Sequence, residues 1–154
     1  MAELKKIEDK INSTLGGEMQ RNSLDFITFM RENGFSFDGF DIGNDEVGWN
    51  PIFKEKSIGC LMITDKFMFW LGLDWCFDDT VSVDNELKEF VWKNVVNCPQ
   101  EPCEPPYCEG DNHSKNNWEI FGKEFKSTCH SPLAFIGPDV ETFDNLKKLL
   151  LFTK

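Results

Sequence analysis

Three strand-like runs follow one another along the chain with almost no residues between them. They are Val47 to Lys54, Ser57 to Ile63 and Phe67 to Asp74, and they hold many of the β-branched and aromatic residues that favour strands. Only Glu55-Lys56 and Thr64-Asp65-Lys66 connect them. Parallel strands need a crossover of about a dozen residues or more, so these short connections predict an antiparallel meander.

Two features of these runs predict where they lie in the sheet. The stretch from Phe67 to Leu73 is apolar at both alternating faces, which predicts a strand that is covered from both sides or that lines an internal cavity. Pro51 has no N–H to donate to a ladder, so the run that contains it is predicted to be an edge strand.

The chain before the meander predicts two helices. Residues 1–20 hold a short peripheral helix with apolar residues at helical spacing. Ser23 is the expected N-cap of the second helix, and Asn33-Gly34 is its expected stop. The aromatic, glycine-punctuated stretch from Phe35 to Glu46 is expected to form a loop or an irregular edge strand.

The chain after the meander predicts two more helices and about two strands. Asp84 and Asp139 are expected N-caps, and the first of these helices is expected to end near Asn97. Trp118 to Phe125 and Leu133 to Ile136 are the expected strands. The predicted fold is therefore a single α+β domain over residues 1–154, in which a three-strand meander and about two C-terminal strands pack with three to four helices.

Composition limits the partners of this domain. Of its 154 residues 40% are hydrophobic and 14% aromatic, which is enough apolar surface for a packed core. The formal charge of −11 repels phosphate backbones and anionic lipid headgroups, so we expect neither nucleic acid nor membrane as a partner. The N-terminal residues lack the apolar core of a signal peptide, and we expect a cytoplasmic protein.

A cysteine cluster is the sequence feature that most suggests chemistry. Residues 98–117 form an expected Pro/Cys-rich loop, and four thiols with two imidazoles fall in or near it: Cys98, Cys103, Cys108 and Cys129, with His113 and His130 as alternates. Thiolates and imidazoles are the ligands of structural zinc. The spacing differs from the paired C-x2-C knuckles of known zinc modules, so free reduced thiols and a redox disulfide stay open as alternatives.

The same region raises the alternative of a thiol-dependent enzyme. Cys129 is the candidate nucleophile, with His113 or His130 as the base. Neighbouring side chains of an extended segment point to opposite faces, so Cys129 and His130 make a poor dyad. Cys60 and Cys76 lie among apolar residues and are expected to serve core packing.

The large aromatic content raises a binding hypothesis. If part of the sheet is concave and uncovered, its rings and the nearby acidic residues would favour an apolar or cationic small molecule. The expected ligand-binding residues are Trp49, Phe69, Trp70 and Trp118. We therefore expect a non-enzymatic small-molecule-binding or sensing domain, as a monomer or homodimer, with a protein-interaction module as a further alternative.

Several short motifs also carry a resemblance to other proteins. They are Gly48-Trp49, Lys54-Glu55-Lys56, Cys60-Leu61, Gly122-Lys123-Glu124-Phe125, Cys129, Pro138-Asp139 and Lys147-Lys148-Leu149-Leu150. Together they resemble a small family of uncharacterised bacterial proteins with a domain of unknown function, in a variant of anaerobic Firmicutes that carries a cysteine-rich loop. The resemblance covers roughly Leu24 to Phe152 and implies an α+β fold and a bacterial origin, but no reaction.

Overall fold

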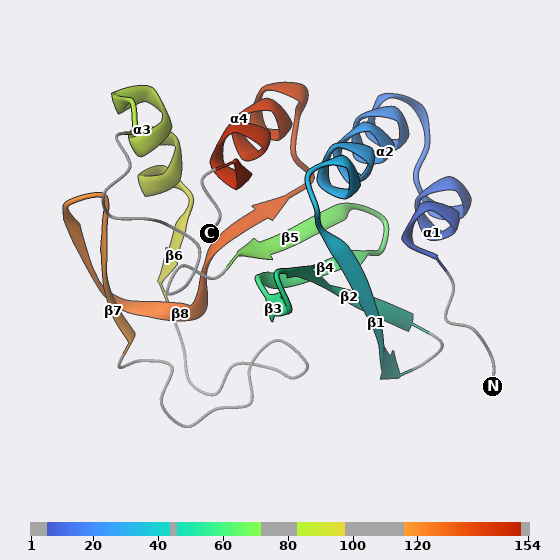
Figure 1. Ribbon diagram of the computed structural model, residues 1–154, viewed down its shortest axis with the longest axis horizontal. Helices are drawn as coiled ribbons and strands as arrows, with labels where there is room; N and C mark the ends of the chain where they lie inside the picture. Colours follow the sequence, from blue (N-terminus) through green and yellow to red (C-terminus); the bar gives the residue numbers. More distant parts are fainter. Residues whose placement is uncertain (1–5, 44–45, 72–82, 98–115, 152–154) are drawn as a thin grey trace.

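Helices gather on one side of an antiparallel sheet, as Figure 1 shows. The computed structural model describes residues 6–43, 46–71, 83–97 and 116–151. The helices are α1 (Ile7–Thr14), α2 (Gly17–Glu32), α3 (Asn85–Lys93) and α4 (Val140–Leu150). The strands are β1 (Ser36–Gly43), β2 (Glu46–Phe53), β3 (Lys56–Ser57), β4 (Gly59–Ile63), β5 (Phe67–Leu71), β6 (Val95–Asn97), β7 (Asn116–Ile120) and β8 (Lys123–Ile136). The predicted α+β class is confirmed.

The predicted meander forms the centre of the sheet. The strand order is β1-β2-β4-β5-β8-β6, with β3 paired to β2 and β7 paired to β8. Lys54 and Glu55 form the tight turn after β2, both with positive φ, at 49° and 69°. Two residues with positive φ give a turn whose twist matches that of the flanking strands, which explains why two residues are enough here.

Pro51 does not mark an edge strand, contrary to the prediction. The strand β2 lies between β1 and β4, because the stretch after Phe35 forms a full edge strand, β1. The carbonyl of Pro51 accepts a hydrogen bond from the N–H of Ile58 at 2.8 Å. Pairing of β2 with β4 stops at Trp49, and pairing with β3 begins at Ile52. Pro51 therefore lies at an irregularity of the ladder, where regular pairing does not require the N–H that proline lacks.

The helix-covered face of the sheet holds the aromatic core. Trp49, Leu61, Phe69 and Phe135 occupy one row across four neighbouring strands, and all are buried. Phe26 of α2 meets Phe69 edge-on, with ring centroids 6.0 Å apart. Burial of such rings is the main source of stability for a domain of this size.

The opposite face of the sheet is less deeply buried. Along β5, Phe67, Phe69 and Leu71 are buried, whereas Met68 and Trp70 are half-buried. The apolar run was predicted to be covered on both faces or to line a cavity. Among the described residues, only its helix-covered face is fully buried.

Local sequence signals predicted three of the helix ends correctly. The α2 stop is as predicted: the N–H of Phe35 bonds to the carbonyl of Met30, the N–H of Gly34 bonds to that of Arg31, and Gly34 has φ 91°. The predicted start is wrong, because α2 begins at Gly17 and Ser23 lies buried in its middle. A helix that packs one face on a sheet extends as far as that face is covered, whatever residue could cap it sooner.

The two aspartate caps are confirmed, and two other boundaries are corrected. Asp84 accepts from the N–H of Leu87 and Asp139 from that of Thr142, both at 2.8 Å. The helix α3 ends at Lys93, and the chain then forms β6 instead of continuing as helix towards Asn97.

The stretch from Trp118 to Phe125 is not one strand but the tip of a hairpin. It turns at Phe121 and Gly122, both with positive φ, at 48° and 86°. The strand β8 that follows is 14 residues long and also contains the predicted strand Leu133 to Ile136. No helix of the described ranges is long and apolar enough to cross a membrane.

Candidate functional site

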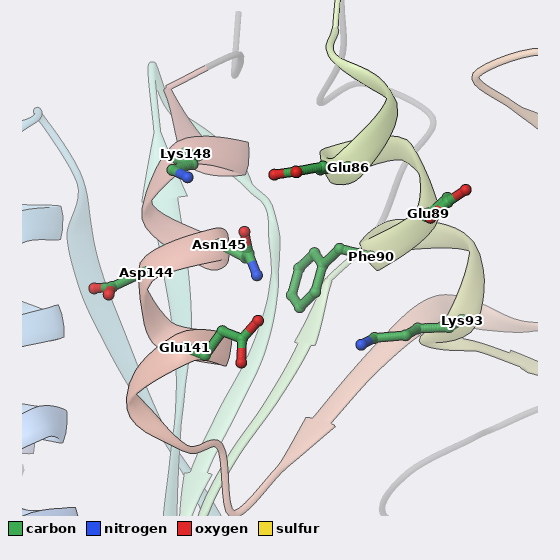
Figure 2. Close-up of a pocket in the computed structure, with 8 residues that line it drawn as sticks. All are labelled: Glu86, Glu89, Phe90, Lys93, Glu141, Asp144, Asn145 and Lys148. Carbon is green, nitrogen blue, oxygen red and sulfur yellow. The ribbon is translucent and has the colours of Figure 1, made fainter.

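A groove of about 450 Å³ runs between α3 and α4 (Figure 2). This volume falls within the range of small-molecule sites in proteins. Its lining consists of charged and polar side chains around one aromatic ring: Glu86, Glu89, Phe90, Lys93, Glu141, Asp144, Asn145 and Lys148. The groove is therefore a polar site with a single apolar contact.

The two helices line the groove with the same residue spacing. On α3 the lining follows E-x-x-E-F-x-x-K from Glu86, and on α4 it follows E-x-x-D-N-x-x-K from Glu141. Residues at these intervals share one face of a helix, so each helix presents a carboxylate at the start of that face and an ammonium at its end. In both helices an aspartate cap precedes the first glutamate by two residues. The groove thus has two similar walls.

The walls run in opposite directions. Figure 2 shows Glu86 and Lys148 facing each other at one end of the groove, and Lys93 and Glu141 at the other. All four side chains are exposed, and none of them forms a hydrogen bond or an ion pair with any part of the chain that the structure describes. Each end of the groove therefore offers one negative and one positive group that are free to bind a ligand.

The middle of the groove is less polar than its ends. Phe90 points into the space between the helices, and Asn145 faces it from α4 (Figure 2). The Phe90 ring is only 5% exposed and stacks on Phe135 of β8, with centroids 5.5 Å apart and an interplanar angle of 15°. This stacking holds the ring against the sheet at the floor of the groove.

One carboxylate next to the groove has a shifted pKa. Hydrogen bonds from the backbone and side chain of Thr142 lower the pKa of Asp139 below its usual value near 3.8, and the positive charge of Lys93 adds a smaller effect in the same direction. Lys93 is therefore close enough to the N-terminus of α4 for its charge to act there.

The structure does not bring the predicted ligand-binding aromatics to one place. Trp49 and Phe69 share the helix-covered face and are 3% and 0% exposed. Trp70 lies on the opposite face, in the row of Cys60 and Ala134. Trp118 pairs with Phe125 in the β7–β8 hairpin, at the far end of β8 from Phe135. Their role in ligand binding stays a prediction.

The predicted metal site falls largely outside the described residues. Cys98, Cys103, Cys108 and His113 lie there. Cys129 and His130 belong to β8, and their side chains are also outside the description. Within the ranges that the structure describes, no group of three or more His, Cys, Asp or Glu side chains is placed to hold a metal ion.

The backbone nevertheless places the two ends of the cysteine-rich segment together. Asn97, the last residue of β6, pairs with Thr128 of β8, and Asn116, the first residue of β7, pairs with the same Thr128. Cys98 follows Asn97 in the chain, and Cys129 follows Thr128. Asn97 and Asn116, the described residues on either side of 98–115 in the sequence, therefore both lie next to the residue before Cys129.

Cys60 is the one cysteine whose side chain is described, and it does not have the environment of a reactive thiol. It is half-buried on β4, and burial raises its pKa to about 11. A thiol with a raised pKa is almost fully protonated at neutral pH and is a poor nucleophile. This agrees with the packing role expected from the sequence.

The α3–α4 groove was not among the sites expected from the sequence. Its signal was present as the shared spacing of an aspartate cap, a glutamate two residues later and a lysine seven residues after that, in Asp84–Lys93 and again in Asp139–Lys148. Each copy alone is an ordinary amphipathic helix, and only the packing of the two helices makes them face each other. No known protein family, curated protein or solved structure matches this chain.

Proposed function

We propose that this domain is a non-enzymatic small-molecule-binding protein and that its α3–α4 groove binds an organic ammonium compound. The observation that carries the proposal is the groove itself, in which the carboxylates of Glu86 and Glu141 and the ammonium groups of Lys93 and Lys148 lie at the two ends and Phe90 lies between them (Figure 2). The sequence predicted an apolar or cationic ligand at aromatic residues of the sheet. The groove supports the cationic ligand at a different place.

Electrostatics favours a positive group in this groove. The eight lining residues carry a net charge of −2, although Glu89 and Asp144 point away from the space between the helices (Figure 2), and the whole chain carries −11. Both charges raise the local concentration of a cation and oppose the approach of an anion. Phe90 is 5% exposed and stacks on Phe135, so it adds only a small apolar contact for the carbon chain of an amine at the floor of the groove.

The test is a titration with butylammonium chloride, followed by two-dimensional amide NMR, with sodium chloride at the same concentration as the reference. The amide shifts of α3 and α4 should change with the amine and not with sodium. The double variant Glu86→Gln/Glu141→Gln should weaken binding, whereas Glu32→Gln, an exposed carboxylate of α2 outside the groove, should not. If the amine shifts no amide of α3 or α4, the proposal fails.

A second proposal concerns the cysteine cluster. We propose that Cys98 and Cys129, with Cys103 and Cys108 or with the alternates His113 and His130, hold a structural zinc ion. The pairing of both Asn97 and Asn116 with Thr128 supports this, because it anchors the two ends of the cysteine-rich segment next to Cys129. Four such ligands could close a tetrahedral site.

Elemental analysis of the protein purified under reducing conditions tests the zinc proposal. We expect one zinc per chain, lost in Cys129→Ser and retained in Cys60→Ser, the matched thiol control on β4. If the purified protein contains no zinc and does not take it up from solution, the site does not exist.

A further inference from the structure

We infer that the ligand of the α3–α4 groove is a short peptide of about three residues with both termini free. This inference rests on the proposed function and specifies its ligand class. A free peptide carries an ammonium at one end and a carboxylate at the other, and the groove offers partners for both. The inference follows from the charge order, the length and the floor of the groove.

The charge order distinguishes a zwitterion from a simple cation. At one end Glu86 faces Lys148, and at the other Glu141 faces Lys93 (Figure 2). A diammonium compound would meet a lysine at both ends, and a dicarboxylate would meet a glutamate at both. A ligand with one charge of each sign can place its ammonium by the glutamate of one end and its carboxylate by the lysine of the other. Such charge-assisted contacts are stronger than neutral hydrogen bonds.

The length of the groove sets the length of the peptide. Glu86 and Lys93 are seven residues apart on α3, as are Glu141 and Lys148 on α4. Seven residues of α-helix rise roughly 10.5 Å. An extended peptide spans at most about 3.3–3.6 Å per residue, so about three residues bring its two termini to the two ends of the groove.

The floor of the groove suits the middle of a peptide. The Asn145 amide can donate to a peptide carbonyl and accept from a peptide N–H, and in Figure 2 it faces Phe90 across the groove. Phe90 is 5% exposed and offers a peptide side chain only a small apolar contact. Because the two ends carry the same pair of charges, a peptide could bind in either direction, and we expect broad sequence tolerance.

The experiment compares three forms of one peptide by calorimetry on the full chain. The forms are trialanine with free termini, the same peptide N-acetylated, and the same peptide C-amidated. We expect the free form to bind tightest, with a loss of about tenfold in affinity when either terminus is capped. Trialanine should also bind tighter than dialanine, which is too short to reach both ends.

A variant pair tests the role of the lysines. The double change Lys93→Gln/Lys148→Gln should remove the preference for the free over the amidated peptide, whereas Lys56→Gln, an exposed lysine on β3, should leave it intact. Circular dichroism of each variant checks that it folds. If the double variant folds and still prefers the free carboxylate, the groove is not where the carboxylate binds, and the inference is overturned.

The outcomes separate this inference from the proposed function. If butylammonium binds in the groove but the amidated peptide binds as tightly as the free one, the ligand is a cation and the peptide inference is overturned while the function stands. The same holds if butylammonium binds and no form of the peptide does. If neither the amine nor any peptide form binds at millimolar concentration, both are overturned.

Discussion

The two flanks of α4 differ although they belong to one helix. On the flank towards α2, Phe143 of α4 contacts Phe26 of α2, with ring centroids 5.2 Å apart. Lys147 pairs with Asp25 and lies over the ring of Phe29, 5.8 Å from its centroid. On the flank towards α3, charged side chains face each other across an open groove and pair with no residue of the described ranges.

The difference shows how one amphipathic helix can serve both stability and binding. The α2 flank buries rings and pairs Lys147 with Asp25 at the rim, so these groups are already satisfied within the protein. On the α3 flank Phe90 packs on the sheet, and the charges at the two ends of the groove have no partner among the residues that the structure describes. This flank therefore adds little to folding, and its charges can contact a ligand. We therefore expect mutations on the α2 flank to change stability and mutations on the α3 flank to change binding.

The largest expected effect is on the α2 flank. Phe26→Ala removes a fully buried ring that contacts Phe67, Phe69 and Phe143, and should lower the free energy of unfolding by about 3–5 kcal/mol. Chemical denaturation followed by tryptophan fluorescence measures it. The matched change on the other flank, Glu86→Ala, should cost less than about 0.5 kcal/mol. Equal losses for the two variants would show that the flanks do not differ.

A smaller effect of opposite sign is expected at Ser23 of α2. Its hydroxyl is fully buried and has no hydrogen-bond partner among the described residues, which costs free energy without a compensating bond. Ser23→Ala should raise the free energy of unfolding by about 1 kcal/mol or less. Thermal unfolding measures the change, and Ser13→Ala, an exposed serine of α1, is the reference. A clear loss of stability in Ser23→Ala would mean that the hydroxyl is satisfied.

The ion pair at the rim of the α2 flank should contribute modestly. Asp25 is 68% exposed, so Asp25→Asn should cost roughly 0.2–1 kcal/mol, and added salt should reduce this cost. Denaturation at low and high ionic strength measures both. Glu86→Gln, which removes a carboxylate that has no ion pair with the described residues, should change stability less than Asp25→Asn at either ionic strength. A larger cost for Glu86→Gln would show that the α3 flank has a paired charge.

The smallest effect is a pKa change at the N-terminus of α4. Because the pKa of Asp139 is lowered in the folded protein, its stabilising effect is present above pH 3.8 and is lost as the pH falls through the folded pKa. Lys93→Gln should raise that pKa slightly, and Lys148→Gln, at the other end of the groove, should raise it less. Carboxyl NMR titration measures both. An unchanged pKa in Lys93→Gln would remove Lys93 from the surroundings of Asp139.

Features set by neighbouring residues could be predicted from the sequence. The Asp84 and Asp139 caps and the Asn33-Gly34 stop depend on hydrogen bonds within one turn of chain, and all three are present. Residue types close together in the sequence also predicted a short turn at Glu55-Lys56. The observed turn, at Lys54 and Glu55, lies one residue earlier. Such contacts need no partner elsewhere in the fold, so the residue types are sufficient evidence.

Features set by distant partners could not be predicted in this way. The missing N–H of Pro51 predicts an edge strand because it is a local property. It does not show that β1 pairs with the other edge of the same strand, β2. Ser23 was predicted as an N-cap because the residues next to it do not indicate that the helix begins at Gly17. Phe121 was predicted to lie in a strand, because a phenylalanine with positive φ is rare. Pairing of β7 with β8 instead places it in the turn between these strands, with positive φ.

The sequence by itself determined the fold class, the meander, the helix caps and the acidic character of the surface, since these follow from composition, periodicity and contacts within a few residues. Only the tertiary structure decided which side chains meet. It separated Trp49 and Trp70 onto opposite faces of the sheet, and it set Glu86 opposite Lys148 and Lys93 opposite Glu141. The groove between two ordinary amphipathic helices exists because both pack on one sheet, and that arrangement depends on contacts between residues far apart in the chain.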